Sequence, residues 1–255
     1  MSPLIALLLL STAPAPRTIT LDVGGVARTA LVYFPKSGEP SRPAPLVFCW
    51  HGHGGSSAQA ARSFRIHEHW PEAAVAYPQG LPTPGRYDPE GKRAGWQRNE
   101  GDQSGRDLAF FDALLARLKK ERPIDTKRIY AMGHSNGGRF TFLLWAARGD
   151  VFAAFGPSGS PAVGLAASFK PKSAFVVAGE QDRLVSFAGM KAGIESIRRL
   201  LRCSEFGKPE KNGYLTREKG VGGTELAAYV HPGGHEFPAD GGKLIAEFFK
   251  RHFAR

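Results

Sequence analysis

Cysteine is scarce in this chain of 255 residues, which contains only Cys49 and Cys203. Two cysteines cannot form the dense disulfide framework of a small secreted domain, and no cysteine and histidine spacing typical of zinc is present. Cys49 lies within an apolar run and Cys203 at the end of an expected helix, so we expect two buried free thiols. The hydrophobic content of 42% is enough for a full core instead.

The sequence also lacks an apolar run long enough to span a bilayer, which takes about 20 residues. The apolar run at the N-terminus is too short, but it is followed by small residues, as in a secretory signal peptide cleaved after Ala13 or Ala15. We therefore expect a signal peptide over residues 1–15, a secreted or periplasmic location, and a single domain over 17–255. A basic n-region is missing, so a frayed apolar tail or an over-extended start is the alternative.

Acidic residues are in the minority. The 34 lysines and arginines exceed the 23 aspartates and glutamates, and the net charge is +11. Such a surface would favour anionic polymer surfaces such as cell-wall polysaccharide. No basic run with interleaved aromatic residues and no nucleic-acid-binding motif is present, so we expect no nucleic acid partner and interpret the charge as a solvated surface.

Internal repeats and low-complexity runs are absent as well. Short apolar runs alternate with helical patterns, which predicts an α/β fold with a mostly parallel central sheet and helices on both faces. An antiparallel hairpin around Gly24 and Gly25 is expected to precede it. The expected strands are 17–22, 27–34, 46–50, 73–77, 128–132, 152–155, 174–178 and 226–230, and the expected helices begin at Ser57 and Asp107, span 140–147 and about 190–201, and begin again near Asp240.

Residues 133–138 form the most informative motif, Gly-His-Ser-Asn-Gly-Gly. They follow an apolar run typical of a strand and precede one typical of a helix, which is the context of a nucleophile elbow. A serine hydroxyl is a weak nucleophile, so Ser135 would need an exposed position on a tight turn beside a base. Gly133 and Gly137 lack a Cβ and would let strand and helix approach closely. The alternative is a glycine-rich turn with an idle serine.

Two later residues fit the acid and the base of a Ser-His-Asp triad in the order that α/β-hydrolases use. Asp182 comes shortly after a buried strand, and His235 lies in a glycine-rich loop after the last expected strand. Glu180 is the rival acid and His231 the rival base. Asp182 has the better distance from its strand, and His235 has the glycines on its N-terminal side.

An oxyanion hole needs two backbone N–H donors. One is expected from Asn136, the residue after the candidate nucleophile. The other is expected from the loop after the strand 46–50, where His53 is the candidate and Gly54 the next choice. A metal site built from His51 and His53 is the alternative, but no supporting cluster of Asp, Glu or Cys accompanies them, so we expect no metal.

These motifs together resemble the polyhydroxybutyrate depolymerase-like and feruloyl esterase-like branch of the α/β-hydrolases. The resemblance covers about residues 45–238, and its motifs are fairly specific. It implies that Ser135, Asp182 and His235 are nucleophile, acid and base of a single catalytic domain that needs no metal or organic cofactor. The segments that carry it are 50–56, 77–80, 95–96, 107–111, 124–130, 133–138 and 233–235.

The chain departs from the family pattern at three places beside the implied triad. Arg139 replaces a hydrophobic residue, Arg183 replaces a proline, and Glu236-Phe237 replaces Thr-Trp. We expect these departures to lie near the acyl or alcohol pocket and therefore to affect the substrate. Phe237 is a candidate pocket residue, and so is Trp96, which lies in a long loop over residues 81–105. The alternative is an ordinary surface loop with Trp96 packed onto the core.

The sequence therefore predicts a serine-dependent carboxylic-ester hydrolase that works through an acyl-enzyme. Its substrates are expected to be polyhydroxyalkanoate-type, feruloyl or other short acyl esters, either small or polymeric. An acyltransferase or a peptidase could use the same triad, and a silent polysaccharide-binding protein could use the same scaffold. The sequence leaves the oligomeric state open.

Overall fold

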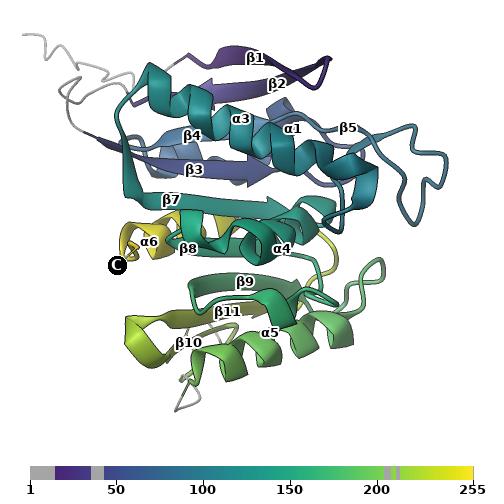
Figure 1. Ribbon diagram of the computed structural model, residues 1–255. Helices are drawn as coiled ribbons and strands as arrows, with labels where there is room; N and C mark the ends of the chain where they lie inside the picture. The colour runs from purple at the N-terminus through teal and green to yellow at the C-terminus, as the bar shows by residue number, and fades with distance from the viewer. Residues whose placement is uncertain (1–14, 36–42, 204–207, 211–212, 255) are drawn as a thin grey trace, which may run out of the picture.

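A computed structural model describes residues 15–35, 43–203, 208–210 and 213–254 (Figure 1). In these ranges the central sheet has nine strands in the order β1-β2-β4-β3-β7-β8-β9-β11-β10. The inner strands are parallel, whereas β1, β2 and β10 run antiparallel to their neighbours. The predicted α/β fold with an N-terminal hairpin is confirmed. The predicted signal peptide falls almost entirely on residues 1–14, which lie outside the described residues.

The strands and helices lie close to their predicted positions. The strands of the central sheet are β1 (Arg17–Val23), β2 (Val26–Tyr33), β3 (Ala44–Trp50), β4 (Ala74–Pro78), β7 (Ile124–His134), β8 (Ala154–Ser158), β9 (Ser173–Gly179), β10 (Leu215–Lys219) and β11 (Glu225–His231). The helices are α1 (Ser57–Phe64), α2 (Ile66–His69), α3 (Arg106–Glu121), α4 (Asn136–Arg148), α5 (Phe187–Leu201) and α6 (Gly241–Lys250). The sequence did not predict β10, the short helix α2 or the small sheet of β5 (Leu81–Pro82) and β6 (Ala94–Gly95).

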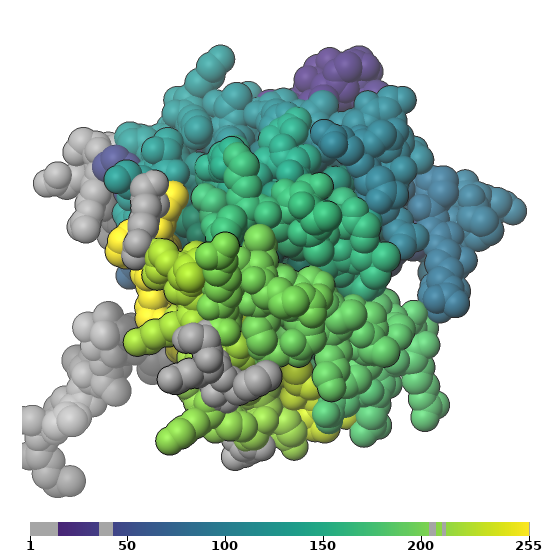
Figure 2. Space-filling model, turned by 60° about the horizontal axis from the view of Figure 1, so that its bottom comes forward, coloured from purple at the N-terminus to yellow at the C-terminus, as the bar shows by residue number. Residues whose placement is uncertain are grey.

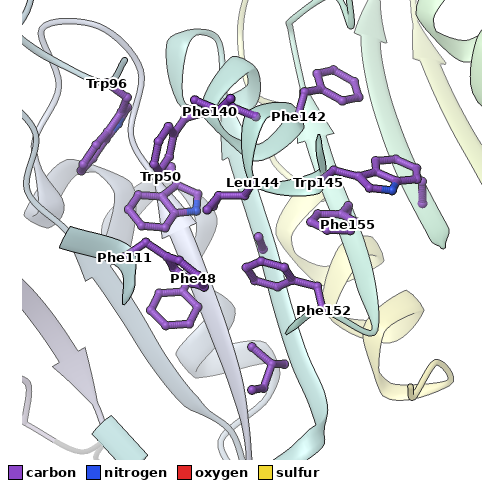
Figure 3. Packing of buried hydrophobic residues seen from close by; sticks show 14 of the residues in the cluster. Phe48, Trp50, Trp96, Phe111, Phe140, Phe142, Leu144, Trp145, Phe152 and Phe155 are labelled. Atoms are coloured by element: carbon purple, nitrogen blue, oxygen red, sulfur yellow. The ribbon is translucent and has the colours of Figure 1, made fainter. Parts of the chain in front are cut away.

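The sheet separates two hydrophobic layers, because successive side chains of a strand point to opposite faces. In β3, Phe48 and Trp50 belong to the layer covered by α3, α4 and α5, which lie in front of the sheet in Figure 1. Val47 and Cys49 belong to the layer covered by α1, α2 and α6. Aromatic rings fill the first layer, where Trp50 packs edge-on against Phe140 with centroids 4.7 Å apart (Figure 3).

Both cysteines are free, as predicted, although only Cys49 is fully buried and Cys203 is half-buried. Burial raises the pKa of the Cys49 thiol well above its ordinary value. None of the helices in the described ranges is long and apolar enough to cross a membrane. The segment between β4 and α3 projects from the body of the molecule (Figure 2).

Candidate active site

The turn between β7 and α4 forces Ser135 into a strained backbone conformation, with φ 56° and ψ −119°. Its N–H donates to the carbonyl of Ser158 at 2.9 Å, which fixes the turn against β8. Close packing requires the two flanking glycines. A Cβ on Gly137 would lie 2.1 Å from the carbonyl oxygen of Trp50, and a Cβ on Gly133 would lie 2.4 Å from the carbonyl oxygen of Gly137. The strained turn presents Ser135 at the carboxyl edge of the sheet, as in a nucleophile elbow.

The structure brings the three candidate triad residues together. His235 Nε2 lies 2.8 Å from Ser135 Oγ, and His235 Nδ1 lies 2.6 Å from Asp182 Oδ2. Asp182 follows β9 and His235 follows β11, and these two parallel strands are neighbours whose carboxyl ends meet at the same edge of the sheet. The Asp182 side chain has no exposed surface, and that of His235 is 18% exposed.

Asp182 is held as a carboxylate by its surroundings. Its Oδ1 accepts hydrogen bonds from the N–H groups of Leu184 and Val185, each at 2.8 Å. Burial by itself would raise the pKa of Asp182, but the N–H groups of Val185 and Leu184 and the contact with His235 outweigh it and keep the pKa below its ordinary value. A carboxylate fixed in this way can orient the imidazole of His235 and stabilise its protonated form.

The two rivals for acid and base lie elsewhere. Glu180 is exposed, and its N–H donates to the carbonyl of His231 at 2.9 Å. His231 is buried, and its Nδ1 accepts a hydrogen bond from the N–H of Gly233 at 3.2 Å. Both residues therefore hold the ends of β9 and β11 together, and neither is hydrogen-bonded to Ser135.

The backbone N–H groups that are candidates for the oxyanion hole differ in whether they already have a hydrogen-bond acceptor. The N–H of Gly54 is already used, because it donates to the carbonyl of Ala94 at 2.7 Å. No acceptor within the described ranges engages the N–H of His53. Asn136 is the first residue of α4, where backbone N–H groups have no partner inside the helix. The two donors expected from the sequence, His53 and Asn136, thus remain the candidates.

The side chains of these two residues hold the 81–105 loop. His53 Nε2 lies 3.0 Å from Asp88 Oδ2. The Asn136 amide makes a reciprocal pair with the backbone of Trp96, accepting from its N–H at 2.7 Å and donating to its carbonyl at 3.0 Å. The loop is thereby fixed to both of the segments that carry the candidate oxyanion donors.

His51 does not have a free nitrogen for a metal ion. Its Nδ1 donates to the carbonyl of Gly52 at 2.7 Å, and its Nε2 accepts from the N–H of Gly80 at 2.9 Å. Burial lowers its pKa, which keeps the ring neutral in this arrangement. Among the described residues, no group of three His, Cys, Asp or Glu side chains is placed to hold a metal ion. Both histidines thus have partners within the protein.

A cavity of about 460 Å³ opens beside Ser135 and His235. Its walls are the glycine-rich loop after β3, the exposed side of α1 and an aromatic end formed by Phe64 and Phe237. The two rings pack edge-on with centroids 4.7 Å apart. Phe237 therefore lines the cavity, and its contact with a substrate stays a prediction.

Trp96 does not line this cavity, so that expectation was wrong. Its side chain is fully buried and stacks on Phe140, with ring centroids 5.5 Å apart (Figure 3). The indole N–H donates to the carbonyl of His51 at 2.9 Å. A large ring that finds both apolar neighbours and a hydrogen-bond acceptor in the core gains more there than at a wet cavity wall.

The three departures from the family pattern also have different places. Arg139 is buried away from the cavity and donates to the carbonyls of Arg98 and Val163 and to the side chain of Asn99. Burial lowers its pKa to about 10. Arg183 is exposed and is not among the lining residues. Of the departures, only Phe237 lines the cavity, whereas Arg139, Arg183 and Glu236 do not.

His134 was not predicted as a site residue, but its ring lines the cavity and lies 4.9 Å from that of His235, centroid to centroid. The residue occupies the variable position of the Gly-x-Ser-x-Gly motif, where no local rule demands a histidine. The one signal in the sequence was a polar ring at the end of a strand otherwise buried over residues 129–133.

Comparison with known proteins finds no matching family model. The chain is 26% identical over 232 residues to feruloyl esterase D of Neurospora crassa, covering 86% of this chain and 77% of that protein. It is 27% identical over 201 residues to a bifunctional acetylxylan esterase/xylanase of Neocallimastix patriciarum, covering 76% of this chain but only 27% of that protein.

Solved structures share the fold. The acetyl xylan esterase from Aspergillus awamori superposes with a TM-score of 0.69 at 13% identity, covering 92% of this chain and 98% of that one. A thermostable esterase gives a TM-score of 0.67 at 18% identity, covering 94% of this chain and 63% of that one. At such identities the likeness concerns the fold alone.

Proposed function

We propose that this chain, a distant member of the feruloyl esterase-like α/β-hydrolases, hydrolyses carboxylic esters with Ser135 as its nucleophile. The observation that carries the proposal is the unbroken chain of hydrogen bonds from Asp182 through His235 to Ser135 Oγ, at 2.6 and 2.8 Å, beside an open cavity. Nucleophile, base and orienting acid are within the reach that such chemistry requires.

The steps follow from these contacts. Ser135 Oγ attacks the ester carbonyl while His235 Nε2 takes the hydroxyl proton, and Asp182 stabilises the resulting imidazolium. The N–H groups of His53 and Asn136 hold the oxyanion of the tetrahedral intermediate. His235 then returns the proton to the departing alcohol, which leaves an acyl-enzyme. Water, deprotonated by the same histidine, attacks the acyl carbon and releases the acid.

The cavity and the relatives guide the choice of substrate. The relatives at 26% and 27% identity are a feruloyl esterase and an acetylxylan esterase, which act on esters of different acyl size. The cavity has an apolar aromatic end at Phe64 and Phe237 and a polar wall with Gln59 and Ser63. We infer short acyl, feruloyl or hydroxyalkanoate esters as the substrate class.

A panel of esters tests this proposal. Hydrolysis rates are measured on p-nitrophenyl esters of increasing acyl length, on methyl ferulate, on acetylated xylan and on a polyhydroxybutyrate film. An added alcohol that diverts the acyl group would indicate an acyltransferase, and cleavage of peptides without cleavage of esters would indicate a peptidase. The proposal would be rejected if the folded protein hydrolysed none of these esters and also did not react with fluorophosphonates.

Phe237 provides a prediction on acyl size. Replacing it with alanine removes one of the two rings at the apolar end of the cavity. The space that the ring leaves should accept a longer acyl chain. Since one methylene in an apolar pocket is worth about 10-fold or more in kcat/KM, the kcat/KM for p-nitrophenyl hexanoate relative to that for the acetate should rise by about tenfold. Phe253→Ala is the matched control, because Phe253 is an exposed phenylalanine outside the cavity. An unchanged ratio would place the acyl group elsewhere.

Chelation should not affect the enzyme. The ring nitrogens of His51 and the Nε2 of His53 have protein partners, and the proposed steps use no metal ion. We expect the rate of p-nitrophenyl acetate hydrolysis after dialysis against EDTA to match that of the untreated protein. Activity lost in EDTA and restored by zinc would mean that a metal-bound hydroxide is the nucleophile.

A further inference from the structure

We propose that His134 is a positioning residue that holds His235 in place against Ser135 through a hydrogen bond to the main chain of the base itself. The proposal rests on the proposed function, because it assigns a role in the same site. Its basis is the contact between His134 Nε2 and the carbonyl oxygen of His235, at 2.8 Å, between residues 101 positions apart in the chain.

The partners of His134 fix which of its nitrogens carries the proton. A carbonyl oxygen can only accept, so Nε2 must be the donor to His235. Nδ1 then has a lone pair, and Ser158 Oγ, 3.0 Å away, donates to it. Both ring nitrogens are therefore used, and the ring cannot turn over without losing two hydrogen bonds.

The same contacts connect nucleophile and base by a second path. The carbonyl of Ser158 accepts the N–H of Ser135, and its hydroxyl donates to His134, which in turn donates to His235. The end of β8 thus fixes the backbone of the nucleophile and, through one ring, the backbone of the base. This path does not depend on the hydrogen bond between Ser135 Oγ and His235 Nε2, which must break and re-form during each turnover.

Packing keeps the ring of His134 in this position. It lies between the ring of His235, 4.9 Å away, and that of Phe237, 6.0 Å away, centroid to centroid. Gly159 leaves the space it needs, because a Cβ there would lie 2.7 Å from His134 Cε1. Other contacts hold the residues beside the base: the N–H of Gln181 donates to the carbonyl of Gly233 at 3.0 Å. The contact from His134 acts on His235 itself.

Neutrality makes a histidine suitable here. Burial lowers the pKa of His134 to about 4, and the nearby His235 and His231 lower it as well, whereas Asp182 and the carbonyl of His235 raise it. The ring therefore stays neutral in the neutral pH range, while His235 takes and returns the proton during turnover. A cation so close to His235 would oppose formation of the imidazolium, while a neutral donor can position the base without that cost.

Three substitutions at His134 test the proposal. The amide nitrogen of His134→Gln can take the position of Nε2 and keep the donor, whereas His134→Leu has no donor and His134→Asn is too short to reach the carbonyl. We expect the Leu and Asn variants to lose about 10- to 100-fold in kcat on p-nitrophenyl acetate, with KM within about threefold of wild type, since small misplacements of a catalytic group have effects of this size. The Gln variant should stay within about fivefold of wild type.

A second measurement separates positioning from contact with substrate and from folding. The rate of inactivation by a fluorophosphonate also requires the base, so it should fall in parallel with kcat in the Leu and Asn variants and recover in the Gln variant. Circular dichroism and thermal unfolding check that each variant is folded. If one of the two donor-free variants fails to fold, the other still provides the comparison with Gln.

Two results would overturn the proposal. One is a folded Leu or Asn variant with wild-type kcat, and the other is a folded Gln variant that loses as much as Leu. The Ser135→Ala variant distinguishes failure of the positioning proposal from failure of the proposed function. If Ser135→Ala is inactive and the His134 variants are unaffected, only the positioning role is wrong. If Ser135→Ala remains active, the proposed function itself is wrong.

Discussion

Replacement of Ser135 by alanine is expected to lower kcat for ester hydrolysis by about 10⁶-fold, because no other group can form the acyl-enzyme. The remaining rate, from the oxyanion donors and substrate binding, should still exceed that of the reaction in water by about 10³-fold or more. The fold should be unaffected. Alanine has the same Cβ as serine, so the strained backbone at φ 56° is no more costly, and the N–H still donates to Ser158.

A fluorophosphonate probe measures the same prediction directly, because it reacts with a serine only when a base activates the hydroxyl. Labelling should map to Ser135 by mass spectrometry and disappear in Ser135→Ala. Ser63→Ala is the matched control, since Ser63 lines the same cavity and, among the residues that the structure describes, no base is hydrogen-bonded to it. We expect this control to keep full labelling. Labelling that persists in Ser135→Ala would show that another residue is the nucleophile.

The sheet was predictable wherever a strand is buried on both faces. All residues of β3 and β9 are buried, and such short apolar runs stand out in the sequence. The edge strand β10, Leu215–Lys219, was missed because most of its residues are polar. One of them, Glu218, is buried only because Arg198 pairs with it. This pairing across 20 positions leaves no local signal.

Strand ends were less predictable than strand centres. β8 spans Ala154–Ser158, whereas the sequence indicated residues 152–155. Phe152 is fully buried but precedes the strand, and Gly156 and Pro157 belong to it despite a weak preference for strands. Burial and hydrogen bonding are separate properties, and the sequence reports mainly the first.

The candidate triad was predictable because parallel strands end at one edge of the sheet, so residues just after different strands meet there. The positions of Trp96 and His134 could not be predicted, because they depend on partners distant in the sequence. Trp96 is fixed by Asn136, 40 positions away, and His134 by His235, 101 positions away. The order and ends of the strands indicate the candidate reacting groups but not the side chains that contact them.

Asp182→Asn is expected to lower kcat by about 10⁴-fold, the loss that follows when a triad histidine is left without its orienting acid. The amide oxygen can still accept from Leu184 and Val185, so the loop should keep its shape. The amide cannot stabilise an imidazolium by charge, and if its NH₂ group faces His235, the imidazole is held in the wrong tautomer.

Glu180→Gln removes the same charge from a position two residues away and provides the control. Glu180 is exposed, and its backbone contact with His231 does not involve the carboxylate, so kcat should change by less than about twofold. Steady-state kinetics on p-nitrophenyl acetate at several pH values compare the two variants with wild type. Since the pKa of Asp182 lies below its ordinary value, the acid stays ionised throughout the neutral range, and the ratio of the wild-type rate to that of the Asn variant should not follow a titration of this acid there. A larger loss in Glu180→Gln than in Asp182→Asn would reverse the assignment, and equal small losses would mean that the histidine works without an orienting acid.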